Sequence, residues 1–402
     1  MSLPKQTDFL IIGGGIIGIT VSLELKSRFP DASIVLLEKE KHTGQHASGR
    51  NSGVLHAGFY YTADSLKAKL TRNGNRELTE YCLERKIPIN QCGKLVVAKN
   101  ENELSGLHEL IRRGKDNNVN VELIPAREAR EIEPRAKTYE QALFSPSTST
   151  IDPNDVIKAL VDDAQQTGIK ILMDIKFLGH SDGKIMTNRG DISTGYIINT
   201  AGLYADQIAH QFGFARQYTI LPFKGVYLES TDTQEALRCN IYPVPEIKNP
   251  FLGVHLTVTV KGHVKIGPTA MPALWRENYK GMDNFKLNEL VKIVLTEMKL
   301  LISNQFNFRK LAIDEIKKIS KRKLIACASD LASGIEGNSF TQWGRAGIRA
   351  QLLNTRTKQL VMDFCYEGDD RSFHVLNAVS PAFTCALPFS RLLVDEIERK
   401  LN

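Results

Sequence analysis

The segment from residue 8 to residue 18 constrains the fold more than any other part of the chain. Residues 8–12 form a mostly apolar run typical of a buried strand, and glycines follow with the spacing Gly13-x-Gly15-x-x-Gly18. In a dinucleotide-binding turn, Gly13 permits the tight bend, Gly15 lets backbone N–H groups approach a pyrophosphate, and Gly18 lets the next helix pack close to the strand. The sequence therefore predicts a strand, a phosphate-binding turn and a helix over 16–29.

A second strand supports the same interpretation. Residues 34–37, Ile-Val-Leu-Leu, fit a buried parallel strand, and Glu38 follows them directly, twenty residues after Gly18. An acidic side chain at this place can accept hydrogen bonds from both ribose hydroxyls of a dinucleotide. The alternative, a glycine turn without a ligand, does not account for this second strand and its acidic end.

The rest of the chain indicates two interleaved domains. A helix at 155–167, strands at 169–172 and 196–199, and a strand, loop and helix over 373–400 continue the alternating α/β pattern. Between 219 and 268 the strands have the spacing of an antiparallel sheet. We predict an α/β fold: a Rossmann-like FAD-binding domain, residues 1–80, 145–210 and 345–402, interleaved with an antiparallel-sheet α+β substrate domain, residues 81–144 and 211–344.

Composition and charge narrow the function classes. The chain of 402 residues has no run of eighteen apolar residues, so we expect no membrane span. Its first residues lack the regions of a signal peptide. The six cysteines form no CxxC pair, which favours free thiols and a cytoplasmic location. No zinc-binding spacing, aromatic stacking motif or helix-turn-helix signature is present, so we expect no metal and no nucleic acid.

Much of the net charge of +7 lies in one stretch. Five cations between residues 317 and 323 follow an apolar-periodic segment at 287–308. This pattern has two interpretations: a solvated helix face, or a basic amphipathic patch that contacts an anionic membrane, here the inner membrane face. The sequence leaves both open.

Several motifs together carry a resemblance to a known family. Beside the N-terminal glycines, the chain has Ser48-Gly49-Arg50-Asn51-Ser52-Gly53-Val54-Leu55-His56-Ala57-Gly58 and Phe251-Leu252-Gly253-Val254-His255-Leu256-Thr257. It also has Val264-Lys265-Ile266-Gly267-Pro268 and Gly347-Ile348-Arg349-Ala350-Gln351. Over nearly its whole length the chain resembles the L-2-hydroxyglutarate oxidase/dehydrogenase family of D-amino-acid-oxidase-like FAD oxidoreductases. The resemblance implies oxidation of L-2-hydroxyglutarate, or a close 2-hydroxy acid, to 2-oxoglutarate. Hydride would pass to flavin N5, and electrons then to dioxygen or a quinone.

The resemblance also implies which residues contact FAD. Gly13, Gly15 and Gly18 would hold the pyrophosphate, and Glu38 the adenosine ribose. The loop residues Ser48, Asn51, Ser52 and Gly53 would lie along the flavin. On the adenine and phosphate side we expect Ile175, Ala201 and Gly202. Near the C-terminus, Ser380, Pro381 and Ala382 would open a helix whose positive N-terminus faces the flavin and stabilises its anionic reduced form.

The reaction needs a base for the hydroxyl proton. Histidine suits this role because its ordinary pKa lies near working pH. His56 and His255, one in each of the two histidine-containing motifs, are the candidates for the catalytic base. Either of them, taken alone, would more often be a structural histidine.

A dicarboxylate substrate also needs cationic or hydrogen-bonding anchors. Arg349 is suited to bidentate carboxylate binding, and Lys224 can supply a point charge. Tyr60, Tyr61 and Tyr242 are candidate hydroxyl donors. For Arg349, a surface salt bridge is the alternative.

Two other functions remain open at this point. One is an amino-acid or glycerol-3-phosphate oxidoreductase on the same scaffold. The other is a non-catalytic flavin- or NAD-binding interaction protein that holds a partner through its basic patch.

Overall fold

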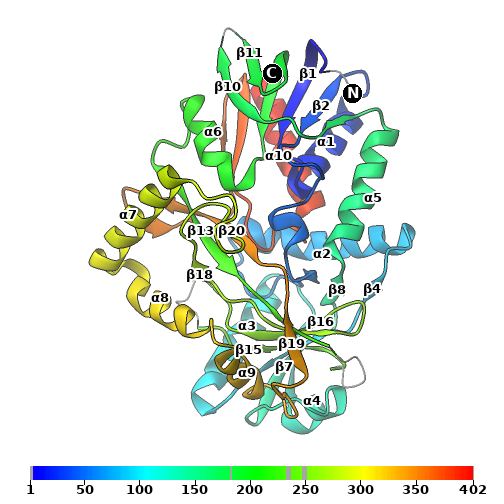
Figure 1. Cartoon of the computed structure of the whole chain (residues 1–402). Helices are drawn as coiled ribbons and strands as arrows, with labels where there is room; N and C mark the ends of the chain where they lie inside the picture. The colour runs from blue at the N-terminus through cyan, green and yellow to red at the C-terminus, as the bar shows by residue number, and fades with distance from the viewer. Residues whose placement is uncertain (1–2, 182, 232–236, 247–250, 402) are drawn as a thin grey trace. The chain divides into compact units, whose positions relative to one another are not determined.

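The computed structural model describes residues 3–181, 183–231, 237–246 and 251–401. The chain divides into two compact units, each built from segments that are distant in the sequence (Figure 1). Unit 1 contains Met1–Arg50, Pro153–Leu221 and Ala350–Asn402, and unit 2 contains Asn51–Asp152 and Pro222–Arg349.

The unit boundaries differ from the predicted domain boundaries. The largest difference is at the first boundary: the chain passes from unit 1 to unit 2 after residue 50, whereas the prediction placed this boundary at residue 80. In unit 2, β3 (Val54–Leu55) and β4 (Ile89–Asn90) both pair with β8 (Ser149–Ile151), and α2 (Leu66–Glu84) packs on β3 and β4. Because β3 and β8 are distant in the sequence, no local pattern shows that residues 51–80 belong with unit 2.

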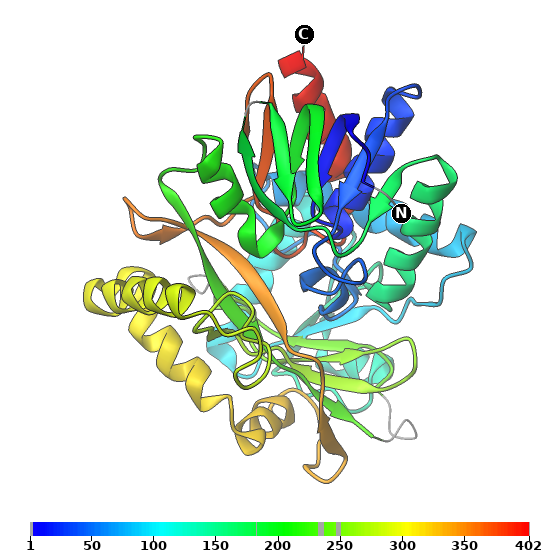
Figure 2. The same cartoon turned by 45° about the horizontal axis from the view of Figure 1, so that its top comes forward.

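Unit 1 is built on a large twisted sheet. Its parallel strands follow the order β23 (Ser372–Asn377), β12 (Gly190–Asn199), β1 (Gln6–Ile12), β2 (Ile34–Leu37) and β9 (Lys170–Leu172). Antiparallel pairs add β10 (Phe177–Ser181) and β11 (Lys184–Thr187) beside β12, and β22 (Cys365–Gly368) beside β23. Figure 2 shows the blue and green strands of this sheet side by side. The predicted Rossmann-like fold is confirmed.

Helices cover this sheet, and most begin near their predicted positions. α1 (Ile16–Arg28) packs against α5 (Pro153–Gln166) and α10 (Ala386–Leu401), and α6 (Ala205–Gln211) packs on β23. The prediction that the last helix opens at Ala382 is wrong. The chain first makes tight turns, in which the N–H of Ala382 donates to the carbonyl of Val379 at 3.0 Å.

Unit 2 contains a second large sheet. Its strands follow the order β19 (Phe340–Trp343), β14 (Leu228–Ser230), β17 (Val264–Gly267), β16 (His255–Val258), β15 (Asn240–Pro243), β5 (Lys94–Val97), β7 (Gln141–Ser145) and β6 (Glu122–Pro125). The sheet is antiparallel as predicted, except that β15 and β5 are parallel. One face packs on a core that includes Leu95, Val97, Ile241 and Leu256.

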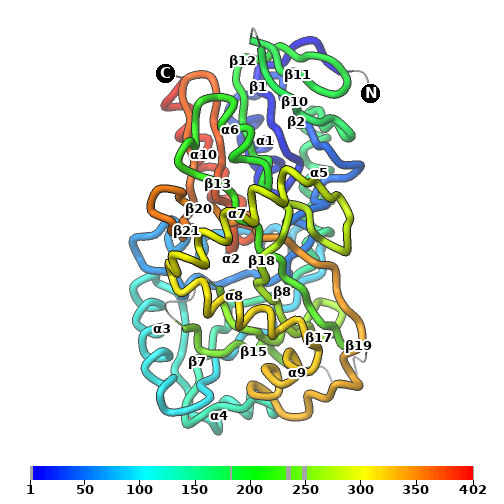
Figure 3. The backbone as a smooth tube through the Cα atoms, turned by 60° about the vertical axis from the view of Figure 1, so that its left-hand side comes forward, coloured from blue at the N-terminus to red at the C-terminus, as the bar shows by residue number. Residues whose placement is uncertain are grey.

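The helices of unit 2 lie outside this sheet. α3 (Leu104–Asp116) and α4 (Ala126–Ile132) contact β6 and β7. The apolar-periodic segment forms α7 (Leu287–Ser303), which is followed by α8 (Phe308–Lys317) and α9 (Lys321–Ser329), yellow to ochre in Figure 3. A separate four-stranded sheet, with strands assigned to both units, has the order β18 (Met271–Pro272), β13 (Tyr218–Gly225), β20 (Gly347–Asn354) and β21 (Gln359–Leu360).

Candidate functional site

The glycine turn of unit 1 is a close backbone contact that side chains would block. Gly13 has φ +113°, and a Cβ on Gly18 would lie 2.0 Å from the carbonyl oxygen of Gly13. The first turn of α1 carries no acidic side chain of its own. The N–H of Ile16 donates to Ser48 Oγ at 3.0 Å. Ser48 therefore lies at the N-terminus of α1, beside the turn that would hold a pyrophosphate.

Glu38 is fixed at the end of β2 by backbone donors. Its Oε2 accepts from the N–H of Gly14 at 2.8 Å, and its Oε1 accepts from the N–H of Glu40 at 2.9 Å. Each carboxylate oxygen keeps a further lone pair, which suits it to ribose hydroxyls. The N–H of Ile175 donates to the carbonyl of Glu38 at 2.9 Å, so this predicted residue lies beside Glu38.

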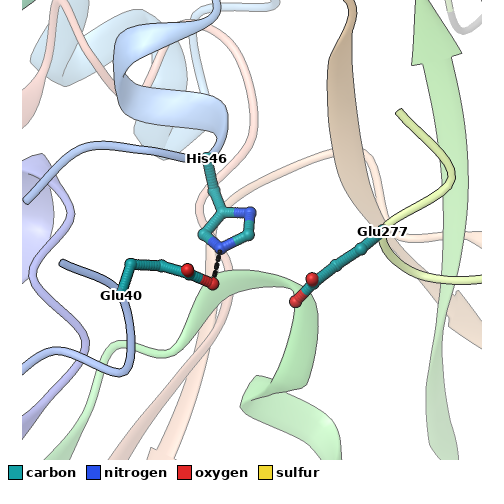
Figure 4. A group of neighbouring side chains, drawn as sticks. All are labelled: Glu40, His46 and Glu277. Carbon is teal, nitrogen blue, oxygen red and sulfur yellow. Dashed lines mark hydrogen bonds and ion pairs between the residues drawn. The ribbon is translucent and has the colours of Figure 1, made fainter. Parts of the chain in front are cut away.

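A hydrogen bond anchors the chain that follows Glu38. His46 Nε2 lies 3.0 Å from Glu40 Oε1 (Figure 4). This bond, opposed by burial and helped by Lys39, lowers the pKa of Glu40 to about 2. Glu40 is therefore ionised at neutral pH, and it holds the segment that leads to Ser48.

The end of β12 lies beside the same glycine turn. Thr200 Oγ1 lies 3.1 Å from the carbonyl oxygens of both Ile12 and Gly13. The N–H of Ala201 donates to Asn199 Oδ1 at 3.2 Å, and a Cβ on Gly202 would meet no atom within 4 Å. The predicted second approach of backbone to a cofactor phosphate thus lies at the edge where β1 and β12 both end, the edge at which such sheets bind ligands.

These features of unit 1 fit FAD. They combine a glycine cradle that a Cβ would fill, a helix N-terminus without an acidic residue in its first turn and a fixed carboxylate at the end of the second strand. Ser380, Pro381 and Ala382 form a turn before α10 and do not form its first helical residues.

The other predicted flavin-side residues belong to unit 2. Asn51 Oδ1 accepts from the N–H of Gly53 at 2.9 Å, and Gly53 has φ +78°. Ser52 forms a hydrogen bond with Tyr227. These bonds shape the turn that leads into β3 and then to His56.

Three side chains from helices hold the loop that contains His56. Asn75 Nδ2 donates to the carbonyls of Leu55 and Ser147 at 3.0 and 3.1 Å. Asn117 Nδ2 donates to the carbonyls of Gly58 and Tyr61 at 3.0 and 2.9 Å, and Arg113 Nη1 donates to that of Tyr60 at 2.8 Å. The loop is therefore positioned by α2 and by the end of α3.

Both predicted histidines join one buried cluster in unit 2. The His255 ring stacks on Tyr242, with centroids 3.8 Å apart and planes at 15°. Lys94 Nζ lies 4.2 Å from the centroid of the same Tyr242 ring. Burial and then the charge of Lys94 lower the pKa of His56 well below its ordinary value. The charges of His255 and Arg349 contribute in the same direction.

The hydrogen bond of His255 assigns its protonation. Nδ1 lies 2.9 Å from the carbonyl oxygen of Gly253. A carbonyl only accepts, so Nδ1 carries the proton of the neutral ring and Nε2 has the free lone pair. Burial lowers the pKa of His255 to about 3, against the bond to Gly253 and with further lowering by Lys94 and Arg349. His255 is therefore a neutral imidazole at pH 7 whose Nε2 can accept a proton.

Arg349 lies at the same cluster. Its guanidinium carbon lies 4.8 Å from the centroid of the Phe251 ring. Burial lowers the pKa of Arg349, and the charges of Tyr227, Tyr61 and Glu315 oppose this lowering. Glu315 itself pairs with Lys318 and accepts from the N–H of Ala270. Arg349 therefore joins the cluster that contains His56, His255 and Lys94.

The predicted tyrosines and Lys224 differ in their surroundings. Tyr60 packs on Phe59 with centroids 4.4 Å apart, and burial raises its pKa. Within the described residues, its buried hydroxyl has no hydrogen-bond partner. Tyr61 lies under Lys67, whose Nζ is 5.9 Å from the ring centroid. Lys224 is half-buried in β13 opposite Met271, and no contact described for it reaches the histidines.

Sequence reasoning missed Lys94, which is fully buried in β5. Its signal was a cation inside an otherwise apolar run, Lys94-Leu95-Val96-Val97. Alternate residues of a strand share a face, so Lys94 lies on the same face as Val96, which packs with Phe59 and Tyr242.

The FAD dependent oxidoreductase family model, DAO, matches residues 8–396. The chain belongs to this family. The L-2-hydroxyglutarate dehydrogenase of Escherichia coli K12 is 33% identical over 402 residues, covering 98% of this chain and 94% of that protein. The mitochondrial enzyme of the same name from Nematostella vectensis is 36% identical over 431 residues, covering 99% and 92%. The human mitochondrial enzyme is 33% identical, covering 98% and 89%.

Solved structures show the same DAO-family fold. The FAD-bound, dithionite-reduced L-alpha-glycerophosphate oxidase of Mycoplasma pneumoniae has a TM-score of 0.79 at 23% identity, covering 98% of this chain and 95% of that one. Glycine oxidase from Geobacillus kaustophilus has a TM-score of 0.72 at 19% identity, covering 99% and 96%. Within the described residues, no helix is long and apolar enough to cross a membrane.

Proposed function

We propose that this protein oxidises L-2-hydroxyglutarate to 2-oxoglutarate with FAD as its cofactor. Full-length relatives at 33–36% identity carry the name L-2-hydroxyglutarate dehydrogenase. The observation that carries the proposal is the buried cluster of unit 2. It combines neutral histidines with Lys94 and Arg349, which suits an anionic hydroxy acid that must lose a proton.

FAD bound at unit 1 would accept the hydride from C2 of the substrate, and the protein supplies the rest of the chemistry. The glycine turn and the N-terminus of α1 would bind the pyrophosphate, and Glu38 would bind the ribose. We assign the substrate site to unit 2.

His255 is the better candidate for the base, with His56 second. Nε2 of His255 carries the lone pair and Nδ1 is held by Gly253, so the ring is oriented to take the hydroxyl proton. A bound dianion would raise the pKa of this histidine from its low value, because it opposes the charges of Lys94 and Arg349. Base strength would thus increase when the substrate is present.

Arg349 would bind one carboxylate of the substrate in two-pronged geometry. The Tyr60 hydroxyl, which is buried without a partner among the described residues, would donate to a substrate oxygen. Lys224 and Tyr61 stay predicted contacts.

An anaerobic titration with L-2-hydroxyglutarate tests this function. The absorbance of oxidised FAD near 450 nm should bleach with the L enantiomer and persist with the D enantiomer. Bleaching by an amino acid or glycerol 3-phosphate, with none by L-2-hydroxyglutarate, would assign the chain to another substrate. Bound FAD that no such compound reduces would favour the non-catalytic alternative.

We further propose that the basic patch and the helices before it bind an anionic lipid surface. α7 exposes many apolar side chains, although its buried face includes Glu289 and Glu297, with exposures of 5% and 9%, beside Ile293 and Leu300. Its exposed apolar residues, 38–73% exposed, include Leu287, Val291, Leu295, Met298, Leu301 and Ile302. On α8 and just after it, Ile313, Ile316 and Ile319 are also exposed.

Charge indicates lipid as the partner of this face. Exposed cations lie around it at Lys280, Lys292, Lys299, Arg309, Lys310, Lys317, Arg322 and Lys323. An apolar helix face edged by cations is the pattern of helices that lie in the interface of an anionic membrane. A quinone in that membrane would then be the electron acceptor, and dioxygen the alternative. The six free thiols fit the cytoplasmic side.

Vesicle sedimentation tests the lipid proposal. Protein should pellet with vesicles of phosphatidylglycerol and phosphatidylcholine but not with phosphatidylcholine alone. Leu295→Glu, or neutralisation of Lys317, Lys318, Lys321, Arg322 and Lys323 together, should abolish pelleting. Binding that survives both changes, or a concentration-dependent dimer lost with Leu295→Glu, would refute it. The electron acceptor is identified from the rate at which reduced flavin is reoxidised. A faster rate with a quinone under anaerobic conditions than with air-saturated buffer would identify the quinone as the acceptor.

A further inference from the structure

Lys94 is a buried cation without a counter-ion in the free protein. Its side chain is 0% exposed, and within the described residues its Nζ has no hydrogen-bond partner. Buried charges are normally paired, because an unpaired one loses its hydration without compensation. Lys94 therefore lacks the partner that a buried ammonium requires.

The contacts described for this ammonium are with aromatic rings. Nζ lies 4.2 Å from the centroid of Tyr242, 5.1 Å from that of Tyr60 and 5.5 Å from that of Phe59. Ring faces attract a cation weakly, and they leave its N–H donors without acceptors. An acceptor that reaches these donors would complete the site.

The groups near Lys94 indicate that the missing hydrogen-bond acceptor is an anion. The groups within electrostatic reach of Lys94 include His56, His255 and the Cys92 thiol. The histidines are neutral or cationic, and burial raises the pKa of Cys92, so this thiol is not a counter-charge near neutral pH. The hydroxyl of Tyr60 points to the same requirement, because it too is buried without a partner in the described part of the chain.

We propose that Lys94 binds one carboxylate of the dicarboxylate substrate while Arg349 binds the other. This inference rests on the proposed function and assigns the second cation that a dicarboxylate requires. It assigns that role to Lys94, whereas the sequence prediction named Lys224, which lies in β13 opposite Met271.

The position of Lys94 in the sheet supports a fixed location for the atom that binds the second carboxylate. Lys94 is aligned with Asn240 of β15 on one side and with Ser145 of β7 on the other. A side chain rooted between two paired strands loses little freedom when it binds. Selection for a second carboxylate can then be tight, because a substrate with one carboxylate would leave the ammonium unpaired.

Binding of the substrate should also be coupled to the uptake of a proton by Lys94. Burial lowers the pKa of free Lys94 to about 7, so about half of the molecules carry the charge at pH 7. A carboxylate that binds Nζ stabilises the charged form, so binding takes up about half a proton at pH 7 and more at pH 8.

The test uses FAD-loaded protein with glutarate, which has both carboxylates but no hydroxyl to oxidise, and with butyrate, which has one. Affinities come from calorimetry in two buffers of different ionisation enthalpy, which also gives the protons taken up. In Lys94→Met the preference for glutarate over butyrate should fall roughly 10- to 150-fold, the range for a charged hydrogen bond. The difference in proton uptake between the two proteins should be about half a proton at pH 7.

Lys69→Met is the matched control, because it removes an exposed lysine of α2 in the same unit. It should leave both the preference and the proton uptake unchanged. If Lys94→Met folds, binds FAD and keeps the wild-type preference and uptake, the role of Lys94 is refuted while the proposed function stands. A wild-type protein that neither binds glutarate nor is bleached by L-2-hydroxyglutarate refutes both.

Discussion

Replacement of Lys94 by methionine should stabilise the protein while it weakens substrate binding. Methionine keeps the length and most of the packing of the side chain but carries no charge. Burial lowers the pKa of Lys94 from 10.5 to about 7. At about 1.4 kcal/mol per pKa unit, the buried charge then costs the folded state about 5 kcal/mol at and below pH 7. We therefore expect Lys94→Met to raise the free energy of unfolding by about 4–5 kcal/mol at pH 7.

The pH dependence of the stability difference between the two proteins distinguishes removal of the buried charge from improved packing as the cause of the stabilisation. The unfolded state keeps the lysine proton up to about pH 10, whereas the folded state releases it near pH 7. The cost is therefore full below pH 7 and declines as the pH rises toward 10.5. Between pH 7 and 9 the wild type should gain about 2 kcal/mol relative to the variant. Urea unfolding of both proteins with saturating FAD measures the difference. A variant that is less stable than wild type at pH 7, or a difference independent of pH, would contradict the reasoning.

Three further perturbations test other parts of the site. His255→Asn should slow flavin reduction by L-2-hydroxyglutarate about 10²- to 10⁴-fold in anaerobic stopped flow; wild-type speed would exclude His255 as the base. Asn75→Ala removes two bonds at 3.0 and 3.1 Å to loop carbonyls, so urea unfolding should show a loss of about 1–3 kcal/mol. Gly18→Ala places a Cβ 2.0 Å from the carbonyl of Gly13, so fluorescence titration should show FAD affinity at least about tenfold weaker; unchanged affinity would mean that this close contact is not needed.

The sequence was sufficient where the signal is local. The apolar run, the glycine spacing and Glu38 predicted α1 and β2 to within a residue and β1 to within two, because each rests on neighbours in the chain. The turns before α10 were missed because nothing in Ala382-Phe383-Thr384 opposes a helix locally. The hydrogen bonds that delay the helix connect backbone groups of a loop, and sequence patterns do not show them.

The site in unit 2 could be predicted only in part, because it depends on pairing between distant strands. Both histidines were found from their motifs, but their meeting requires the loop after β3 and strand β16 to lie on one face. The partner of that face, β5, joins β15 in parallel register, and such pairing leaves no local trace. Lys94 was therefore assigned to a strand without a role, and Lys224 was named as the cationic anchor.

Two buried acids, Glu133 and Asp206, differ from Lys94 in how their polar atoms are satisfied. Glu133 accepts from the backbone of Arg135 at 3.0 Å, and Asp206 accepts from that of Ile220 at 2.9 Å. These carboxylates are satisfied within the chain, so their burial needs no ligand. Lys94 has no such partner among the described residues and lies beside the histidines. A buried unpaired charge costs stability that an apolar side chain of similar volume would not, so the presence of Lys94 in this cluster argues for an anion that arrives with the substrate.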